Sequence, residues 1–188
     1  LSCVRIPSTD QKIQAEYYFS PQGNVKIEKY YDINSNNPNV AKKIMLNDLG
    51  RTLFFNNDNE LGAFFIEKIY KNGDIFFSDR NLHTSHVFNL TSTDIPVIAV
   101  LHSTHIKDIN DLEHSSFKNV YKGVFEHLNR YKAIVVSTIQ QQLDVSARIN
   151  NSIPVVAIPV GFTSVDTQSS TNNDVAIPPR KLISVARY

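Results

Sequence analysis

The chain of 188 residues has little of several residue types, and each shortage excludes a class of protein. Its one cysteine, Cys3, excludes an internal disulfide framework, and the first residues lack the basic, apolar and small-residue zones of a secretory signal peptide. With 19 basic and 18 acidic residues, no global field attracts nucleic acid or an anionic membrane. No apolar run approaches the roughly 20 residues of a membrane-spanning helix. These shortages favour a folded, cytoplasmic protein.

Glycine-rich and nucleophile motifs are also missing. The six glycines never form Gly-x-Gly-x-x-Gly or a Walker loop, so the chain carries no autonomous nucleotide site. Ser103 and Ser137 each have a histidine nearby in the sequence, but no Gly-x-Ser-x-Gly elbow exists. Serine-hydrolase chemistry is therefore disfavoured, whereas an apolar fraction of 41% is ordinary for a protein with a real core.

Residues 1 to 56 predict an antiparallel β-meander. Short runs rich in Tyr, Ile and Val alternate between apolar and polar residues, and clusters of Pro, Gly and Asn interrupt them. The predicted strands span residues 14–19, 25–31, 42–46 and 51–55. No crossover helix is expected in this part.

From residue 57 the pattern changes to helices alternating with strands. Asp58 or Asn59 can cap a first helix, which Asn72-Gly73 ends. Its predicted buried face consists of Leu61, Phe64, Phe65 and Ile69.

Further strands are predicted at 75–77, 95–101, 133–136 and 154–158. Between them we expect a short helix near 83–88, a second capped by Ser115 or Ser116, and a third that Ser137 caps and that runs to about residue 149. Strands and helices alternating at this length indicate an α/β fold, with a parallel sheet and helices on both of its faces.

The stretch 95–101 is apolar at every position, which is typical of a strand buried on both faces. His102 follows it directly, and ligands of open α/β sheets bind beyond the carboxyl ends of the strands. His102 is therefore the leading site residue, and the alternative is a histidine that caps the following turn. His105 lies on the same loop, where it would face an acceptor, steady His102 or be a plain solvated residue.

Two His-x-x-His pairs raise the alternative of a metal-dependent hydrolase: His83/His86 and His102/His105, with Asp79 and Asp108 nearby. Helical zinc pairs usually have the spacing i, i+4, and neither pair has the His-Glu-x-x-His pattern. The sequence therefore disfavours this alternative.

Several short motifs occur in an order that resembles a known family. They are the strand-terminal His102, the strand "IVVS" ending at Ser137, "VAIPVGF" at 156–162 and the closing "LISVARY" at 182–188. Together they resemble the retaining GT-B glycosyltransferases of family 4. With the meander in front, the chain looks like the branch that glycosylates poly(glycerol-phosphate) teichoic acids or serine-rich adhesins.

The resemblance implies a division of the chain. Residues 1–56 would be an antiparallel β insertion, 57–162 a Rossmann-like domain that belongs to the N-terminal half of the enzyme, and 163–181 a linker. Residues 182–188 would open a nucleotide-sugar-binding domain that the chain lacks. On this reading the chain is a fragment, and the fragment alone would be inactive.

The resemblance also assigns site residues. His102 would approach the hydroxyls of the donor sugar near the reacting carbon, and Arg187 would hold the donor diphosphate. Without the family, Arg187 is an ordinary candidate for a surface ion pair. His105 and Ser137 are further substrate-binding candidates. The resemblance implies no metal and no cofactor, and the donor it implies is a UDP-linked nucleotide sugar.

The predicted reaction moves a hexose or an N-acetylhexosamine from a UDP-sugar to a teichoic acid polymer or a serine-rich glycoprotein. The meander carries lysines beside tyrosines, which suit a polymer or polypeptide acceptor or an oligomer contact, and its alternative is a solvated sheet face. Peripheral membrane association is a further partner prediction, and nucleic acid is not a predicted partner. A non-catalytic acceptor-binding or assembly partner remains the main alternative function.

Overall fold

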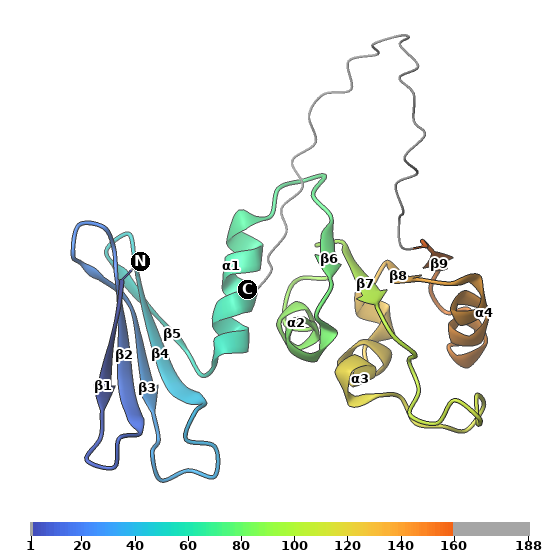
Figure 1. Ribbon diagram of the computed structural model, residues 1–188. Coiled ribbons are helices and arrows are strands. Elements are labelled where there is room, and N and C mark those ends of the chain that lie inside the picture. Colours follow the sequence, from blue (N-terminus) through green and yellow to red (C-terminus); the bar gives the residue numbers. More distant parts are fainter. Residues whose placement is uncertain (1, 160–188) are drawn as a thin grey trace, which may run out of the picture.

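The computed structural model describes residues 2–159, which form two sheets of different kind (Figure 1). The linker at 163–181, the strand at 182–188 and Arg187 lie outside the described residues. Helix α1 (Asp58–Ile69) stands between the two sheets in the chain and in space. The predicted fold class, α/β with an added antiparallel sheet, is confirmed.

The first sheet has five antiparallel strands in the order β1-β2-β3-β4-β5, so each strand pairs with the next in the chain. Their bounds are Ser2–Pro7, Ile13–Phe19, Val25–Tyr31, Ala41–Asp48 and Arg51–Phe55. Leu49 and Gly50 join the last two strands with φ of 48° and 82°, which is the geometry of a tight two-residue hairpin. The predicted meander is confirmed, with β1 as a strand beyond the four predicted ranges, and its interpretation as an insertion stays a prediction.

One face of this sheet packs against α1. Ala41, Ile44 and Leu46 of β4 form a buried cluster with Leu61 of the helix. Lys29 of β3 also pairs with Asp58, in the first turn of α1. The antiparallel sheet is thus attached to the rest of the chain through this helix.

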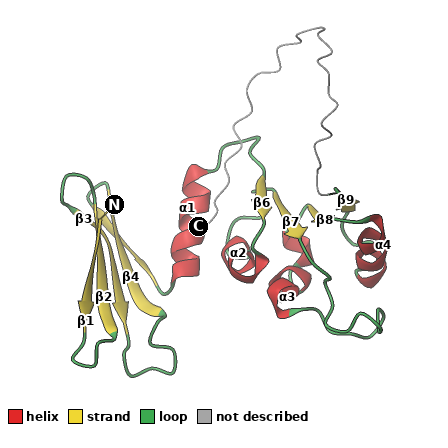
Figure 2. Cartoon of the chain, viewed as in Figure 1, coloured by secondary structure: helices red, strands yellow, loops and turns green. Residues whose placement is uncertain are grey.

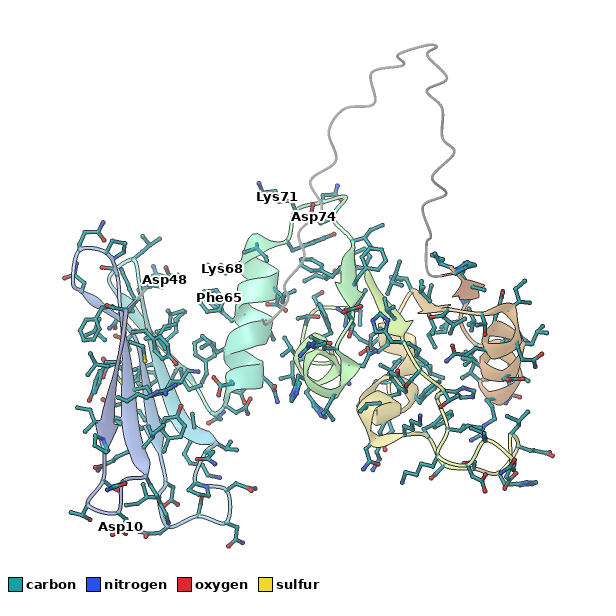
Figure 3. The ribbon with its side chains drawn as sticks, in the orientation of Figure 1. Asp10, Asp48, Phe65, Lys68, Lys71 and Asp74 are labelled. Atoms are coloured by element: carbon teal, nitrogen blue, oxygen red, sulfur yellow. The ribbon has the colours of Figure 1, made fainter. Side chains whose placement is uncertain are left out.

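Helix α1 differs from the prediction at its start and on its buried face. The N-cap is Asn57, whose side chain accepts hydrogen bonds from the backbone N–H groups of Asn59 and Glu60. Phe65 and Ile69 are 41% and 51% exposed, and Figure 3 shows Phe65 projecting from the helix.

The reason is that α1 has two neighbours. Leu61 and Phe64 contact the cluster of the antiparallel sheet, whereas Ile66 packs against the core of the second sheet. A single stripe of residues cannot serve both contacts. The sequence pattern described only one of them.

The second sheet has four parallel strands in the order β6-β7-β8-β9. They are Phe76–Ser78, Val97–Leu101, Ala133–Val136 and Val155–Ala157. The connections contain α2 (Asn81–Phe88), α3 (Asn119–Phe125) with the 3₁₀ turn Leu128–Arg130, and α4 (Ile139–Arg148). Parallel strands joined through helices are confirmed.

The prediction that helices cover both faces of this sheet is wrong for residues 2–159. Because the strands follow one another in chain order, right-handed crossovers place α2, α3 and α4 on the same face (Figure 2). Val97, Ala99 and Leu101 of β7 are buried against those helices, but Ile98 and Val100 on the opposite face are only half-buried. The strand predicted at 95–101 is therefore β7, Val97–Leu101, and it is fully buried on one face only.

Two of the predicted helix caps are also wrong. Helix α3 begins after Lys118, which makes no side-chain cap, while Ser115 Oγ accepts a hydrogen bond from the backbone of Asp108, 2.8 Å away. Helix α4 is capped by Thr138, whose side chain accepts from the backbone N–H of Gln141, and not by Ser137. At α3 the predicted capping serine, Ser115, bonds the backbone of the preceding loop instead.

Arg130 fixes the loop that leads from α2 into β7. The side chain is buried, and its Nε and Nη1 donate to the carbonyl oxygens of Phe88 and Ile95 at 2.8 and 2.9 Å. Nη2 donates to Thr91 Oγ1 at 2.5 Å. Burial lowers the pKa of this guanidinium from its ordinary value. Its N–H donors nevertheless find three acceptors in the segment from the end of α2 to β7, and hydrogen bonds from a charged donor are strong.

In the part of the chain that the structure describes, no helix has both the length and the apolar character needed to cross a membrane.

A buried carboxylate in the antiparallel sheet gives the first prediction. Arg5 Nε, Tyr18 OH and Tyr31 OH donate to the carboxylate of Glu16 at 2.8, 2.9 and 2.8 Å. Burial would raise the pKa of Glu16, but the hydrogen bonds from Tyr31, Tyr18 and Arg5 outweigh it and lower that pKa below 4.5. The stability that Glu16 contributes is therefore complete above about pH 5 and is lost as the pH falls through the folded-state pKa.

We expect Glu16→Gln to cost about 1–2 kcal/mol of unfolding free energy at pH 7 and to flatten the loss of stability in acid. Denaturant unfolding from pH 7 to pH 3 measures both effects. Glu28→Gln, which changes the Tyr30–Glu28 pair on the opposite face of the sheet, is the matched control. An unchanged acid profile in Glu16→Gln would contradict the assignment.

Candidate functional site

The candidate site lies at the carboxyl edge of the parallel sheet. The strands β6, β7 and β8 end at Ser78, Leu101 and Val136, and they run side by side in the same direction. The next residues along the chain are Asp79, His102 and Ser137. The topology therefore gathers three polar side chains at the edge where open α/β sheets bind ligands.

A cleft of about 610 Å³ opens beyond β7 and β8. His102, His105 and Ser137 all line it, so the structure brings together the three predicted site residues that it describes. One wall comes from the loop after β7 and the other from α4. These walls carry Ile106, Ile109 and Leu112, and Gln140, Gln141 and Asp144.

His102 stands at the mouth of this cleft, with 59% of its side chain exposed. Its Nε2 lies 2.5 Å from Oδ1 of Asp79, the residue that follows the neighbouring strand β6. Asp79 entered the sequence prediction only as a metal-ligand candidate. Asp79 follows a parallel strand directly, as His102 does. The signal that selected His102 could therefore also have selected Asp79.

A buried polar network holds the backbones of this pair in place. Asn81 Nδ2 donates to the carbonyl oxygen of Val100 at 2.6 Å, and Ser78 Oγ donates to Asn81 Oδ1 at 2.8 Å. Both Ser78 and Asn81 are almost fully buried. The end of β6 is thereby tied to the end of β7, two residues before His102. Sequence reasoning missed this network.

Close packing of α2 on α3 supports the network from behind. Ser85 Oγ donates to the carbonyl oxygen of Asn81, and a Cβ atom at Gly123 of α3 would lie 2.5 Å from that hydroxyl. Glycine is therefore required at this crossing. Ser85, which bonds the backbone of Asn81, is thus packed directly against α3.

The loop after β7 is held by contacts from two helices. Tyr121 OH accepts from the backbone N–H of Ser103 and is 3.1 Å from Ser103 Oγ. Gln141 Nε2, from the first turn of α4, donates to the carbonyl oxygen of Ser103 at 2.7 Å. The residue next to His102 is thus fixed from both sides, so the loop start is rigid.

His105 is not the solvated loop residue that the sequence allowed. It is 3% exposed, and its ring lies 6.2 and 6.1 Å from the rings of Phe117 and Phe125. Burial, followed by the charge of Arg148, lowers the pKa of His105 from its ordinary value and so favours the neutral ring. Its Nε2 is buried without a hydrogen-bond partner among the described residues. Among the described residues no hydrogen bond joins His105 to His102, and the role of His105 toward an acceptor stays a prediction.

Ser137 is half-buried at the end of β8, directly before the cap of α4. Arg187 lies outside the described residues. Among residues 2–159 no three His, Cys, Asp or Glu side chains gather into a metal-binding group. His83 and His86 are exposed on α2 and do not line the cleft.

The sequence matches no protein-family model. It is 25% identical over 153 residues to the poly(ribitol-phosphate) alpha-N-acetylglucosaminyltransferase of Staphylococcus aureus (strain COL). The match covers 75% of this chain and 30% of that enzyme. The chain is a homologue of part of this enzyme. The chain thus spans about a third of the length of the relatives it matches.

Solved structures agree in fold. The crystal structure of TarM has a TM-score of 0.67 at 21% identity, with 90% of this chain and 32% of TarM covered. The pneumococcal O-GlcNAc transferase GtfA, solved with UDP and GlcNAc, has a TM-score of 0.54 at 18% identity, with 84% and 34% covered. The mixed α/β fold therefore matches part of these GT-B glycosyltransferases.

Tyr121 gives a prediction about the rigidity of the site. We expect Tyr121→Phe to free the backbone of Ser103, so amide exchange at residues 102–105 should quicken while unfolding free energy falls by only about 1 kcal/mol. Hydrogen exchange of the two proteins checks this. Tyr131→Phe, which removes a buried hydroxyl bonded to Asn89 and not to this loop, is the control. Equal exchange at residues 102–105 in all three proteins would show that Tyr121 does not hold the loop.

Proposed function

We propose that this chain forms part of a retaining glycosyltransferase that moves a hexose or an N-acetylhexosamine from a UDP-sugar to a polymer acceptor. The observation that carries the proposal is the cleft at the carboxyl edge of the parallel sheet, with His102 at its mouth and Ser137 on its wall. The homology to a staphylococcal N-acetylglucosaminyltransferase supports the same reading.

The proposed role of His102 follows from its place and chemistry. The imidazole lies at the end of a fixed strand, and one of its nitrogens is held by Asp79. The other nitrogen remains for a hydroxyl of the donor sugar. A preorganised polar group of this kind accelerates transfer when its bond to the sugar strengthens as charge develops at the reacting carbon.

The walls of the cleft suit an acceptor. Ile106, Ile109 and Leu112 provide apolar surface for the carbon face of a sugar or alditol, while Gln140 and Gln141 provide amide groups for hydroxyls. Holding donor and acceptor together supplies much of the rate of a transfer reaction. Ser137 and His105 would contribute to this substrate surface.

The donor diphosphate needs a cation, and the proposal assigns this task to Arg187. A guanidinium offers a planar fork of donors that matches diphosphate oxygens and stabilises the charge of the leaving group. The proposal requires no metal ion and no cofactor beyond the nucleotide sugar.

The acceptor is proposed as a teichoic acid polymer or a serine-rich protein. The first class agrees with the name of the staphylococcal relative, and the second with the O-GlcNAc transferase GtfA. Both reactions would take place in the cytoplasm, with peripheral membrane association where the acceptor is a membrane-linked polymer.

A second candidate is a non-catalytic acceptor-binding or assembly partner, and one observation favours it. The registers place Val4, Tyr17, Glu28, Met45 and Phe54 in one row across the five antiparallel strands, on the face that α1 does not cover. Val4 and Phe54 are exposed. A row with exposed apolar and aromatic side chains at both of its ends suits contact with an acceptor polypeptide or with another subunit.

The proposed catalytic role of His102 predicts the effect of His102→Ala on the kinetics of the full-length protein. Removal of the imidazole should lower kcat about 100-fold and change KM much less, because the lost bond is strongest in the transition state. Transfer from UDP-N-acetylglucosamine and UDP-glucose to ribitol-phosphate and glycerol-phosphate polymers would measure it. The melting temperature should stay within about 2 °C, since His102 is exposed.

His114→Ala is the matched control, because His114 lies on the same loop but does not line the cleft. It should keep normal kinetics. Near-normal kcat in a folded His102→Ala protein would remove the residue from the catalytic site. A protein that binds acceptor but never turns over a UDP-sugar would favour the assembly-partner reading.

A further inference from the structure

We propose that Asp79 is a positioning residue, which sets the orientation and tautomer of the His102 ring for transfer. This inference rests on the glycosyltransferase function proposed above. It adds a residue from a second strand to the site, and it states which nitrogen of His102 faces the substrate.

The register of the sheet brings the two side chains together. Ser78 of β6 pairs with Ala99 of β7, so Asp79 comes level with Val100 and His102 lies two residues further along. The His102 ring reaches across to the neighbouring strand, where Nε2 lies 2.5 Å from Asp79 Oδ1. The contact therefore joins two parallel strand ends that are 23 residues apart in the chain.

The backbones under both side chains are fixed. Asn81 ties the loop after β6 to the carbonyl oxygen of Val100, and Ser78 is bonded to both Asn81 and Thr84. Tyr121 and Gln141 hold the next residue after His102. The pair therefore cannot separate by backbone motion without breaking these hydrogen bonds.

The side chains themselves are open to solvent, with exposures of 63% for Asp79 and 59% for His102. An exposed pair of this kind adds little to the stability of a fold. Stabilisation of the fold therefore does not explain why the Asp79–His102 contact is formed on a rigid frame. Alignment of the His102 ring explains it better.

The chemistry of the contact decides the roles of the two ring nitrogens. An ionised carboxylate only accepts hydrogen bonds, so Nε2 must carry a proton and donate it. In the neutral ring, Nδ1 is then an unprotonated acceptor, and it is the nitrogen left for a ligand in the cleft. Asp79 thus presents Nδ1 to the donor sugar, where it can accept a hydrogen bond from a sugar hydroxyl.

A double-mutant cycle in the full-length protein tests the inference, with UDP-N-acetylglucosamine as donor and ribitol-phosphate polymer as acceptor. We expect Asp79→Asn to lower kcat at least 10-fold, with little change in either KM and in the melting temperature. In the His102→Ala background the same substitution should cause no further loss, because Asp79 acts only through the ring. Asp111→Asn is the matched control, since it changes another exposed Asp–His pair, with His114, away from the cleft.

Two kinetic results would overturn the inference. Losses that multiply in the double variant would show that Asp79 touches the substrate itself. A normal rate in Asp79→Asn beside an impaired His102→Ala would show that the ring does not need the carboxylate, while the proposed function would stand.

A spectroscopic measurement keeps the inference testable if the protein shows no transfer and the proposed function fails. In histidine labelled with ¹⁵N, the His102 signals are assigned by their loss in His102→Ala. At pH 8 we expect a protonated Nε2 and an unprotonated Nδ1 in the parent protein, and a mixture of tautomers in Asp79→Asn. The same mixture in both proteins would overturn the inference.

Discussion

The parallel pairing of β7 with a strand on each side is the constraint on which the rest of the structure depends. In β7, the residues Val97, Ala99 and Leu101 are fully buried, so the backbone N–H and C=O groups of this strand must find partners in β6 and β8. Parallel neighbours require crossover connections, and these are the helices α2 and α3. Because all the strands point the same way, their carboxyl ends form one edge. The cleft and every described candidate residue at its mouth follow from that arrangement.

Buried polar groups convert this edge into a defined site. Arg130 secures the loop that leads into β7, and Asn81 joins the ends of β6 and β7. Tyr121 holds the residue after His102. Each of these groups is buried with its hydrogen bonds made, which is the condition under which a polar network specifies one arrangement. Exposed, chemically active side chains thus stand on a frame that has little freedom.

The two sheets are connected by a helix that faces both. Leu61 and Phe64 of α1 contact the antiparallel sheet, while Ile66 contacts the parallel one. The side of the antiparallel sheet that α1 does not cover keeps Val4 and Phe54 exposed. This surface is the structural basis for the proposed acceptor or subunit contacts, and it is separate from the residues that line the cleft.

Local patterns predicted the strands, both sheets and the place of His102, because alternation and apolar runs are set by which side chains are buried. The local patterns failed to predict burial where one helix packs against two neighbours. The exposed Phe65 and the buried Ala63 of α1 depend on two packing partners. The predicted cap at Ser137 failed because Thr138, the next polar residue, caps α4, and the one near Ser115 failed because α3 begins later, after Lys118.

The candidate site shows the same limit. His102 could be selected from its place after a strand, and so could Asp79, but their contact depends on which strands are neighbours. The burial of His105 beside the stacked rings of Phe117 and Phe125 depends on how the loop returns along α3, which no local pattern contains. Helices α2, α3 and α4 lie on one face because of the strand order, and the prediction of helices on both faces was wrong because no local pattern contains that order.

The central claim is that the cleft at the carboxyl edge is where sugar transfer takes place. A crystal structure of the full-length protein with a non-hydrolysable UDP-sugar tests it most directly. The account predicts a hydroxyl of the donor sugar about 3 Å from Nδ1 of His102, with Nε2 still bonded to Asp79. A donor sugar bound away from His102, with the cleft left to solvent, would contradict it.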